Sequence, residues 1–327
     1  FSITVNALDD SDTLITLYNG TVNLSDMTGF LSPVTVTLVN GTVTITDATI
    51  TKAYEHNQLL ATDRVTSGES NLFNVVAGTA TTLDLTPDID SVIAGSLQTV
   101  AVSVYDAYGN LVTGYTGTVV FTSSDTLATL PFDYTFTATD AGTHTFSGEL
   151  ILRTASSVTL TADDSSLSDT SNYTVGTAEI AHFVFTSIYS HQDAGVPFDI
   201  TVLAKDEFGN TITDYNGAVT ITDQTGSLSP QTITLTNGTG TISVSVTTAY
   251  LGDFLNATDG TYSGKSGNFD VYAGAPFSLS LNPETASGYT GGTTILTALL
   301  TDQYGNPVPN QTLDWEIISG SGIFPDS

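Results

Sequence analysis

The chain has 327 residues, with 34 acidic side chains against 5 basic ones, a formal net charge of −29 and no cysteine. Five scattered bases cannot form the basic face that nucleic acids or anionic membranes require, so both classes of partner are excluded. Without cysteine there are no disulfides or thiolate metal sites, and the 40% of apolar residues are enough to support packed cores.

Internal repetition is the strongest pattern in the chain. From its first residue, FSITVNALDD matches FDITVLAKDE at 198–207, and LSPVTVTLVNGT matches LSPQTITLTNGT further along the same two segments. A more divergent copy between them carries DAYGNLVTGYTGTVVFT, and a further copy contains TDQYGNPVPNQ. Such self-similarity at a fixed period is typical of tandem repeat proteins.

The period of this repetition is close to 98 residues. The recurring acids at its markers are Asp9, Asp106, Asp206 and Asp302, and the recurring boundary glycines are Gly78, Gly176 and Gly274. We therefore predict four repeats, which are called repeats 1 to 4 below: 1–78, 79–176, 177–274 and 275–327.

Each repeat is expected to consist of short strands. LQTVAVSVYD at 97–106 and TISVSVTT at 241–248 alternate apolar residues with Thr or Ser, which is typical of half-buried strands. Asn40-Gly41 and Asn237-Gly238 lie between alternating runs and predict tight hairpins. About seven short strands in a repeat of this size predict an immunoglobulin-like sandwich. The predicted fold is all-β, with tandem immunoglobulin-like β-sandwiches in an elongated array.

The D-x-[YF]-G-N segments, with the Y-x-G motifs at 115–117 and 215–217, resemble bacterial immunoglobulin-like repeats of the invasin and intimin type. Such repeats occur in prokaryotic adhesins, S-layer proteins and other surface proteins, so the resemblance implies an extracellular or cell-surface location. Two positions depart from the pattern. Residues 9–13 (DDSDT) replace the Gly-Asn turn in repeat 1, and Gln311 stands at the tyrosine position in repeat 4.

The terminal repeats are incomplete by comparison with the others. Repeat 1 begins at the residue equivalent to Phe198, so it lacks the first strand, and repeat 4 is about half a repeat long. The simplest explanation is that the chain is part of a longer array. Alternatively, residues 275–288 (APFSLSLNPETASG) lend the missing strand to repeat 1 of another copy by β-strand addition, which would build a filament.

The D-x-x-G-N loops have two readings. The first is a turn between the second and third strands, in which the aspartate accepts backbone N–H groups. The second is a calcium site, because Ca²⁺ takes six to eight oxygen ligands. In that case Asp206, Glu207 and Glu179 would converge with Asp88 or Asp90. No EF-hand spacing is present, and no other cofactor is expected.

Three further features of the sequence have simple interpretations. Asp9, Asp10 and Asp12 predict a solvated loop that has lost its glycine. Asn40 and Asn237 lie in N-x-[ST] sequons on predicted exposed turns and are glycosylation candidates, although such sequons occur here about as often as chance predicts. The recurring tyrosines predict packing between the sheets at Tyr18, Tyr115 and Tyr215.

No catalytic or cofactor-binding residue is predicted. The four histidines lack a metal-ligand spacing such as H-E-x-x-H, and neither a G-x-S-x-G elbow nor a P-loop occurs. We therefore expect no enzymatic activity. The favoured function is a structural rod, used as an adhesin stalk, an S-layer component or a surface-filament subunit.

Two alternatives stay open. One is a ligand-binding or carbohydrate-binding adhesin module, for which residues 127–146 (LATLPFDYTFTATDAGTHTF) are the candidate because they depart from the other repeats. The other is a spacer region of a secreted hydrolase. Copies of the chain are the expected partners, through strand addition or lateral packing.

Overall fold

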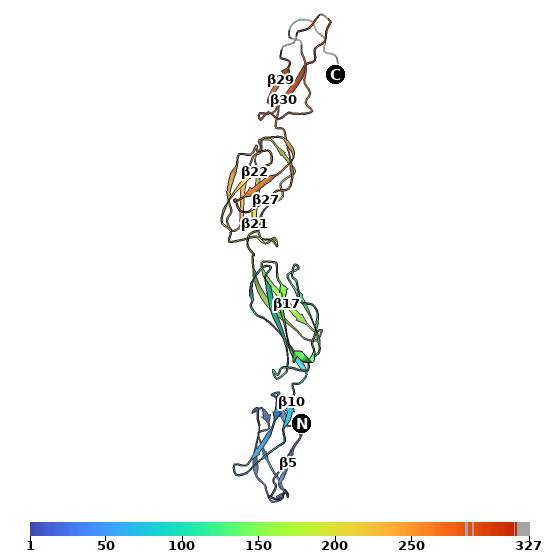
Figure 1. The fold of residues 1–327 in the computed structure, drawn as a ribbon, viewed down its shortest axis with the longest axis vertical. Coiled ribbons are helices and arrows are strands. Elements are labelled where there is room, and N and C mark those ends of the chain that lie inside the picture. Colours follow the sequence, from blue (N-terminus) through green and yellow to red (C-terminus); the bar gives the residue numbers. More distant parts are fainter. Residues whose placement is uncertain (285–286, 290, 317, 319–327) are drawn as a thin grey trace. The chain divides into compact units, whose positions relative to one another are not determined.

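The computed structural model describes residues 1–284, 287–289, 291–316 and 318. The chain divides into two compact units, 1–176 and 177–327. Regular structure consists of β-strands and one short 3₁₀ turn, η1 (Ala138–Asp140), in the part of the chain that is described (Figure 1). The all-β prediction is confirmed. None of the described residues belongs to a helix long and apolar enough to cross a membrane.

Repeat 2 is an immunoglobulin-like sandwich of two sheets. One sheet has the order β11 (Ala80–Pro87), β13 (Leu97–Asp106), β16 (Thr143–Ile151). The other has the order β12 (Ser91–Ile93), β18 (Ser168–Gly176), β17 (Ser157–Asp163), β14 (Thr118–Ser123), β15 (Tyr134–Thr135). The first segment of the repeat contributes β11 to one sheet and β12 to the other, where β12 runs parallel to β18. This arrangement confirms the predicted fold.

The alternating sequence of β13 explains the core of repeat 2. Val100, Val102 and Val104 are fully buried, whereas the residues between them are only partly buried. A strand places successive side chains on opposite faces, so one face of β13 lies against the other sheet. Phe121 and Phe146 meet edge to face in this core, with ring centroids 4.8 Å apart.

Repeat 3 keeps the same plan. Its first sheet has the order β19 (His182–Phe185), β21 (Phe198–Lys205), β24 (Thr239–Val244). The second sheet is divided into two parts: β20 (His191–Asp193), β28 (Phe269–Tyr272), β25 (Tyr250–Asp253), and β23 (Gln231–Thr234), β22 (Ala218–Asp223), β26 (Leu255–Thr258), β27 (Ser263–Lys265). The division arises because the chain interrupts its pairing between β25 and β26 and again between β27 and β28.

Repeat 1 follows repeat 3 but has no counterpart of β19 or β20. Its strands are β1 (Ile3–Asn6), β2 (Thr21–Asp26), β3 (Leu31–Ser32), β4 (Thr35–Thr37), β5 (Thr42–Ile45), β6 (Thr49–Ile50), β7 (Tyr54–Asn57), β8 (Leu59–Thr62), β9 (Ser67–Glu69) and β10 (Phe73–Val75). Among the described residues, β1 pairs with β5 alone.

Repeat 4 contains the antiparallel pair β29 (Ser278–Asn282) and β30 (Thr297–Thr301). All five residues of β29 are exposed, including Leu279 and Leu281. The alternating apolar residues of β29 therefore lack the second sheet that covers their equivalents in repeats 2 and 3, as far as the described residues extend.

The two predicted hairpin turns are confirmed. Asn40 and Gly41 have φ angles of 54° and 79°, and Asn237 and Gly238 have φ angles of 51° and 74°. Positive φ at both central residues is the signature of a type I′ turn, which Asn-Gly favours. The neighbouring amides hold the turns from outside, since Asn19 and Asn216 accept the backbone N–H groups of Asn40 and Asn237.

Candidate functional sites

The D-x-x-G-N loops form the most regular polar site in the chain. In repeat 2, Asp106 Oδ1 accepts the N–H groups of Tyr108 and Asn110 at 2.9 Å, which closes the turn. Asp106 Oδ2 accepts the N–H of the linker glycine Gly78 at 2.8 Å and the Nδ2 amide of Asn110 at 2.9 Å. One carboxylate thus fixes both its own loop and the linker from the preceding repeat. The predicted turn is confirmed.

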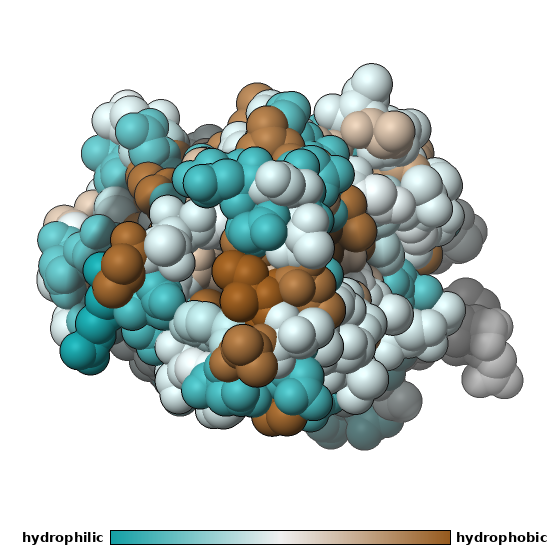
Figure 2. Space-filling model, turned by 90° about the horizontal axis from the view of Figure 1, so that it is seen from below, coloured by the Kyte–Doolittle hydropathy of each residue, from teal (hydrophilic) through white to brown (hydrophobic). Residues whose placement is uncertain are grey.

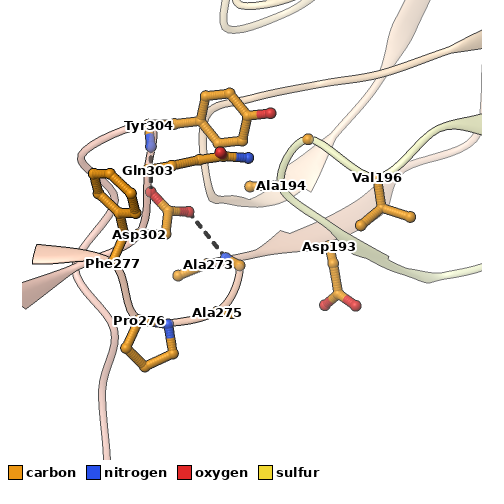
Figure 3. A pocket seen from close by; sticks show the side chains of 12 residues that line it. Asp193, Ala194, Val196, Ala273, Ala275, Pro276, Phe277, Asp302, Gln303 and Tyr304 are labelled. Atoms are coloured by element: carbon orange, nitrogen blue, oxygen red, sulfur yellow. Dashed lines mark hydrogen bonds between the residues drawn. The ribbon is translucent and has the colours of Figure 1, made fainter.

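The same geometry recurs in repeats 3 and 4. Asp206 Oδ2 accepts the N–H of Ala178 at 3.1 Å, and Asp302 Oδ2 accepts the N–H of Gly274 at 2.9 Å. Figure 3 shows the Asp302 carboxylate turned toward the linker backbone, with Tyr304 and Phe277 on either side of it. These residues line a cavity of about 670 Å³.

The asparagine of this loop reaches into the preceding repeat. Asn110 Nδ2 donates to the carbonyl oxygen of Thr51 at 2.8 Å, and its Oδ1 accepts the N–H of Ala53 at 2.9 Å. Asn306 repeats both bonds with Thr247 and Ala249, at 2.7 and 2.9 Å. The amide therefore pairs with the backbone of the neighbouring repeat as another strand would. We call this pair of bonds, with the aspartate–linker bond, the amide clamp.

Hydrogen bonding keeps the clamp carboxylates ionised. Burial raises the pKa of Asp106, but the side-chain amide of Asn110 and the N–H groups of Gly78, Asn110 and Tyr108 outweigh burial and bring the pKa to about 2. The pKa of Asp302 is also lowered, because the amide of Asn306 and three backbone N–H groups outweigh its burial.

The loop of repeat 1 keeps the turn but loses the clamp amide. Asp9 Oδ1 accepts the N–H groups of Ser11 and Thr13 at 2.9 Å, and these bonds lower the pKa of the exposed Asp9. Asp12 adopts the positive φ of the missing glycine, and Thr13 stands in place of the asparagine. The loop end of this repeat also carries exposed apolar side chains, at Leu8, Leu14, Leu17, Val39 and Val65. In the view of Figure 2, brown apolar side chains gather between teal polar ones on one face.

The calcium candidates lie in both units. Asp206 is fully buried, and its two oxygens accept N–H groups of Phe208, Asn210 and Ala178. Glu207 and Glu179 are exposed in the same unit, whereas Asp88 and Asp90 are exposed residues of the other unit. The described residues contain no group of three or more acids and histidines arranged to hold a metal ion. The convergence of these five acids stays a prediction, as does glycosylation at Asn40 and Asn237.

The recurring tyrosines bond to a hairpin of the sheet that does not contain the strand before the D-x-x-G-N loop. The hydroxyls of Tyr18 and Tyr215 donate to Asp63 and Asp259 at 2.8 Å, and the hydroxyl of Tyr115 donates to Asp164. Burial first, and then the aspartate, raise the pKa of Tyr215 to about 12. The tyrosines therefore combine the predicted packing, seen in the edge-to-face contact of Tyr215 with Phe183, with a bond that the sequence did not suggest.

The Y-x-G motif has a steric cause. A Cβ on Gly217 would come within 2.8 Å of the Tyr215 ring, and a Cβ on Gly20 within 2.6 Å of the Tyr18 ring. Gly117 lies equally close beneath the Tyr115 ring. Repeat 4, which has Gln311 in place of the tyrosine, also has Leu313 in place of the glycine.

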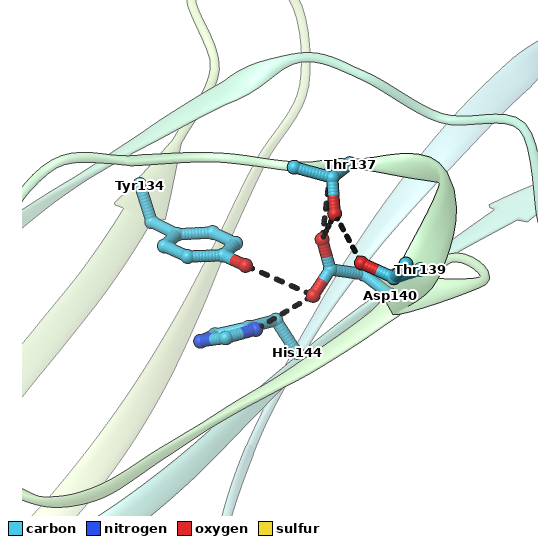
Figure 4. A network of polar contacts seen from close by, with 5 residues as sticks. All are labelled: Tyr134, Thr137, Thr139, Asp140 and His144. Atoms are coloured by element: carbon cyan, nitrogen blue, oxygen red, sulfur yellow. Dashed lines mark hydrogen bonds and ion pairs between the residues drawn. The ribbon is translucent and has the colours of Figure 1, made fainter.

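Residues 127–146 carry a polar network particular to repeat 2. Asp140 Oδ1 accepts the hydroxyl of Tyr134 and contacts His144 Nδ1, both at 2.9 Å, and Asp140 Oδ2 accepts the hydroxyl of Thr137 at 2.7 Å (Figure 4). The rings of Tyr134 and His144 stack with centroids 3.7 Å apart. The N–H and hydroxyl of Thr137, followed by His144 and Tyr134, hold the pKa of Asp140 well below its usual range.

This network orders the segment around η1. The Thr137 hydroxyl is bonded to Asp140 and to Thr139, so it is not placed against the imidazole as a nucleophile would be. Two residues before Tyr134, Phe132 is 89% exposed, and at the other end of the segment, next to Arg153, Leu127 is 51% exposed. The arrangement is that of a rigid loop that presents an apolar side chain to solvent.

The edge of β1 is the third site of interest. Two cavities, of about 420 and 330 Å³, lie beside β1 and share Val5, Ala61 and Gly68. In repeat 3 a Cβ on the equivalent Gly264 would collide with the backbone of Phe183 in β19, whereas the described residues leave the space above Gly68 empty to 4 Å. Repeat 1 therefore retains the glycine that a crossing first strand requires.

Comparison with known proteins gives the following. No family model and no curated protein matches the chain. Among solved structures it is similar to FdeC, an Escherichia coli adhesin, at 17% identity and a TM-score of 0.39, covering 83% of this chain and 91% of that one. It is also similar to invasin, described as a bacterial integrin-binding protein, at 17% identity and a TM-score of 0.35, covering 86% and 58%.

The S-layer protein SbsC is similar at 15% identity and a TM-score of 0.27, covering 93% of this chain and 41% of that one. Weaker similarity, at 10% identity, reaches a family 2 glycosyl hydrolase from Bacteroides cellulosilyticus, of which the chain covers 23%. The chain thus spans less than two thirds of invasin, SbsC and the hydrolase. These similarities are too low to indicate a function.

Proposed function

We propose that the chain is a non-enzymatic structural repeat region of an extracellular or cell-surface prokaryotic protein, used as an adhesin stalk, an S-layer component or a surface-filament subunit. The observation that carries this proposal is the amide clamp. Its aspartate and asparagine occur in the same arrangement in repeats 2 and 4, where they bond to the linker and to the neighbouring repeat. Residues that recur to join repeats serve the array rather than one ligand.

The clamp also accounts for polar groups that would otherwise be candidates for chemistry. Buried Asp106 and Asp302 are ionised, but their oxygens accept N–H groups of their own loop and linker. A carboxylate bonded in this way is a structural anchor and not a general acid, which requires a raised pKa. Stacked repeats that contact only their neighbours gain length by repeat number, which suits a stalk or lattice subunit.

Electron microscopy of the purified chain tests the proposal. Elongated particles with a regular spacing between repeats are expected, and they should become variably bent when Asn110 and Asn306 are both replaced by alanine. A single globular particle, or particles of the double variant that look like those of the unaltered chain, would contradict an array whose repeats are joined by the amide clamp. Lattices or filaments would favour the S-layer and filament roles over a stalk.

A binding role is the second candidate, and residues 127–146 favour it. The Tyr134–Asp140–His144 network rigidifies a segment whose Phe132 is almost fully exposed. An exposed aromatic on a rigid loop can stack on a sugar ring or enter an apolar pocket of a partner. Binding to a glycan array that is lost in Phe132→Ala, and kept in Leu127→Ala, would establish this role. The third possibility, a spacer of a secreted hydrolase, is compatible with the same array.

Association of copies is proposed at the open edge of β1. Unpaired N–H and C=O groups on an exposed strand can pair with an added strand, and β29 of repeat 4 has the alternating apolar pattern of β11 and β19. Light scattering across a wide concentration range tests this proposal. A constant monomer mass at every concentration would rule it out.

A further inference from the structure

Repeats 1 and 3 carry different side chains, an amide and a carboxyl, at a buried corner of the sandwich where a strand is interrupted. In repeat 1 the interruption lies at Asn57, between β7 and β8, and in repeat 3 it lies at Asp253, between β25 and β26. Both side chains are fully buried. A buried amide in repeat 1 is thus replaced by a buried carboxyl in repeat 3.

The bonds of Asn57 define the corner in repeat 1. Its Oδ1 accepts the N–H groups of Met27 and Gln58 at 3.0 and 2.9 Å. Its Nδ2 donates to Asp26 Oδ2, at the end of β2, at 2.9 Å. Asp26 also accepts the N–H of Leu31 at 3.2 Å and the hydroxyl of Thr28 at 2.5 Å. The amide thus ties the end of β2 to the interruption.

Asp253 has the same surroundings in repeat 3. Its Oδ1 accepts the N–H of Phe254 at 2.8 Å, which matches the bond from Gln58. Gln224 stands at the position of Met27, and its N–H donates to the carbonyl oxygen of Phe254 at 3.0 Å. At the end of β22, Asp223 matches Asp26, because it accepts the N–H of Leu228 at 2.9 Å and the hydroxyl of Thr225.

By this equivalence, Asp253 Oδ2 takes the place of the Asn57 amide nitrogen, and the charge of Asp223, which matches Asp26, acts on it. Among the described residues, Asp253 Oδ2 has no hydrogen-bond partner. Burial and the nearby charge of Asp223 both oppose ionisation of Asp253. Something positive must take the place of the amide protons.

We propose that Asp223 and Asp253 share one proton in the folded protein, held on Asp253 Oδ2 and donated to Asp223, so that this corner of repeat 3 loosens when the proton is lost. A protonated carboxyl supplies one O–H donor, which replaces the one bond that Asn57 donates, to Asp26. The device is absent from repeat 1, where the donor is an amide at every pH.

A metal ion fits the corner less well than a proton. Calcium takes six to eight oxygen ligands, and here only two carboxylates meet. The remaining oxygens at Asp223 belong to the hydroxyls of Thr225 and Ser227, which already donate to it. No third acid or histidine joins the pair among the described residues.

The other charged groups around the corner are accounted for. Asp270, on β28, accepts the N–H of Gly252, and the Lys265 ammonium, on β27, lies 3.3 Å from the centre of the Phe254 ring. Burial raises the pKa of Asp253 and the charge of Asp223 raises it further, although the N–H groups of Phe254 and Gln224 oppose this. The pKa of Asp223 is lowered instead, because bonds from Thr225, Leu228 and Ser227 outweigh its burial.

The sign of the effect follows from that raised pKa. An acid whose pKa is higher in the folded than in the unfolded state stabilises the fold at low pH, and the contribution is lost as pH rises through the folded value. Repeat 3 is therefore expected to lose stability toward neutral pH. All the other shifted aspartates in the described part of the chain have lowered pKa values, so their stabilising contribution is lost toward low pH instead.

Hydrogen exchange of the full chain, read by mass spectrometry at pH 5 and pH 8 and corrected for intrinsic rates, tests the proposal. Protection of peptides covering 218–228 and 250–258 should fall at pH 8, by about tenfold for each pKa unit of the shift. The matching peptides of repeat 1, 21–31 and 54–62, serve as an internal reference and should not show this fall.

Two variants remove the proposed shared proton from repeat 3 or introduce it into repeat 1. Asp253→Asn should remove the fall in repeat 3, and Asn57→Asp should create it in repeat 1. If Asn57→Asp does not fold, the ¹³C carboxyl resonance of Asp253 in the unaltered chain provides the readout, and it should titrate above the ordinary aspartate range. Equal pH dependence of repeats 1 and 3 in the unaltered chain would overturn the proposal. So would protection at pH 8 that added calcium restores and EDTA removes.

Discussion

The side-chain amide of Asn110 lies against the backbone of Thr51, 59 residues earlier in the chain, and donates to its carbonyl oxygen at 2.8 Å. Asn306 has the same relationship with Thr247, also 59 residues earlier, at 2.7 Å. Identical spacing and geometry in both units show that the junction is part of the repeat. The consequences of removing it can therefore be stated in advance.

Replacement of Asn110 by alanine is expected to release the linker between repeats 1 and 2. The variant loses both amide bonds and leaves the Thr51 carbonyl and Ala53 N–H without those partners, at a cost of about 1–3 kcal/mol. Hydrogen exchange in residues 74–80 should accelerate, while the core peptides of repeat 2 remain protected. Asn268→Ala, at an exposed position, is the control. Unchanged exchange in the linker would show that the clamp does not hold it.

Acid should open the same junction. The pKa of Asp106 is about 2 in the folded chain, below the ordinary value of roughly 3.9. A lowered folded pKa stabilises the fold above the unfolded value, and the contribution is lost as pH falls through the folded value. Linker exchange in 74–80 should therefore rise between pH 4 and pH 2. In Asp106→Asn this pH dependence should be weaker, and an identical acid profile in both proteins would contradict the assignment.

The Y-x-G motif offers a matched pair of glycines in one loop. A Cβ on Gly117 would collide with the Tyr115 ring, whereas a Cβ on Gly114 has nothing within 4 Å among the described residues. Gly117→Ala should destabilise repeat 2 by about 1–3 kcal/mol, as overpacking does, and weaken the Tyr115–Asp164 bond. Gly114→Ala should be close to neutral. Chemical denaturation of both variants checks this, and equal midpoints would refute the steric explanation.

Much of the fold was predictable because it rests on local patterns. Alternation in 97–106 and 241–248 fixed which faces are buried, and Asn-Gly pairs fixed two type I′ turns through their positive φ. The D-x-x-G-N turn was also predictable, since Asp, Gly and Asn each meet a local backbone requirement there. Each of these patterns depends only on residues that are a few positions apart in the sequence.

The junction and the corner acids were not predicted, because their partners are far away in the sequence. Besides its bonds to Asp106 in its own turn, Asn110 bonds to Thr51 and Ala53 of the preceding repeat. Asp253 was not singled out, although the alignment of repeats 1 and 3 places it opposite Asn57. The alignment of the two repeats shows that an amide is replaced by a carboxyl at this position. Only the structure shows that the position is buried and close to the charge of Asp223.

The equivalent glycines Gly68 and Gly264 test whether a first strand crosses above each of them. Only where a strand crosses should a larger residue at this position be destabilising. Gly264→Ala places a methyl group against the Phe183 backbone in β19. Backbone cannot give way cheaply, so repeat 3 should lose about 1–3 kcal/mol. Gly68→Ala meets nothing within 4 Å in the described part of repeat 1 and should change stability by less than about 0.5 kcal/mol. Denaturation of each variant measures the difference, and a large loss in Gly68→Ala would contradict the open edge.

A peptide then tests whether repeat 1 accepts a strand. A synthetic peptide with the sequence of residues 181–195 carries β19 and β20, and its apolar residues should fill the cavities beside β1. Binding should slow hydrogen exchange in β1 and β10 of the unaltered chain, because the added strand pairs with their free edges. Gly68→Ala should abolish this protection, since its methyl group occupies the path of the peptide backbone. Protection by a scrambled peptide, or undiminished protection in Gly68→Ala, would show that apolar contact rather than strand pairing is responsible.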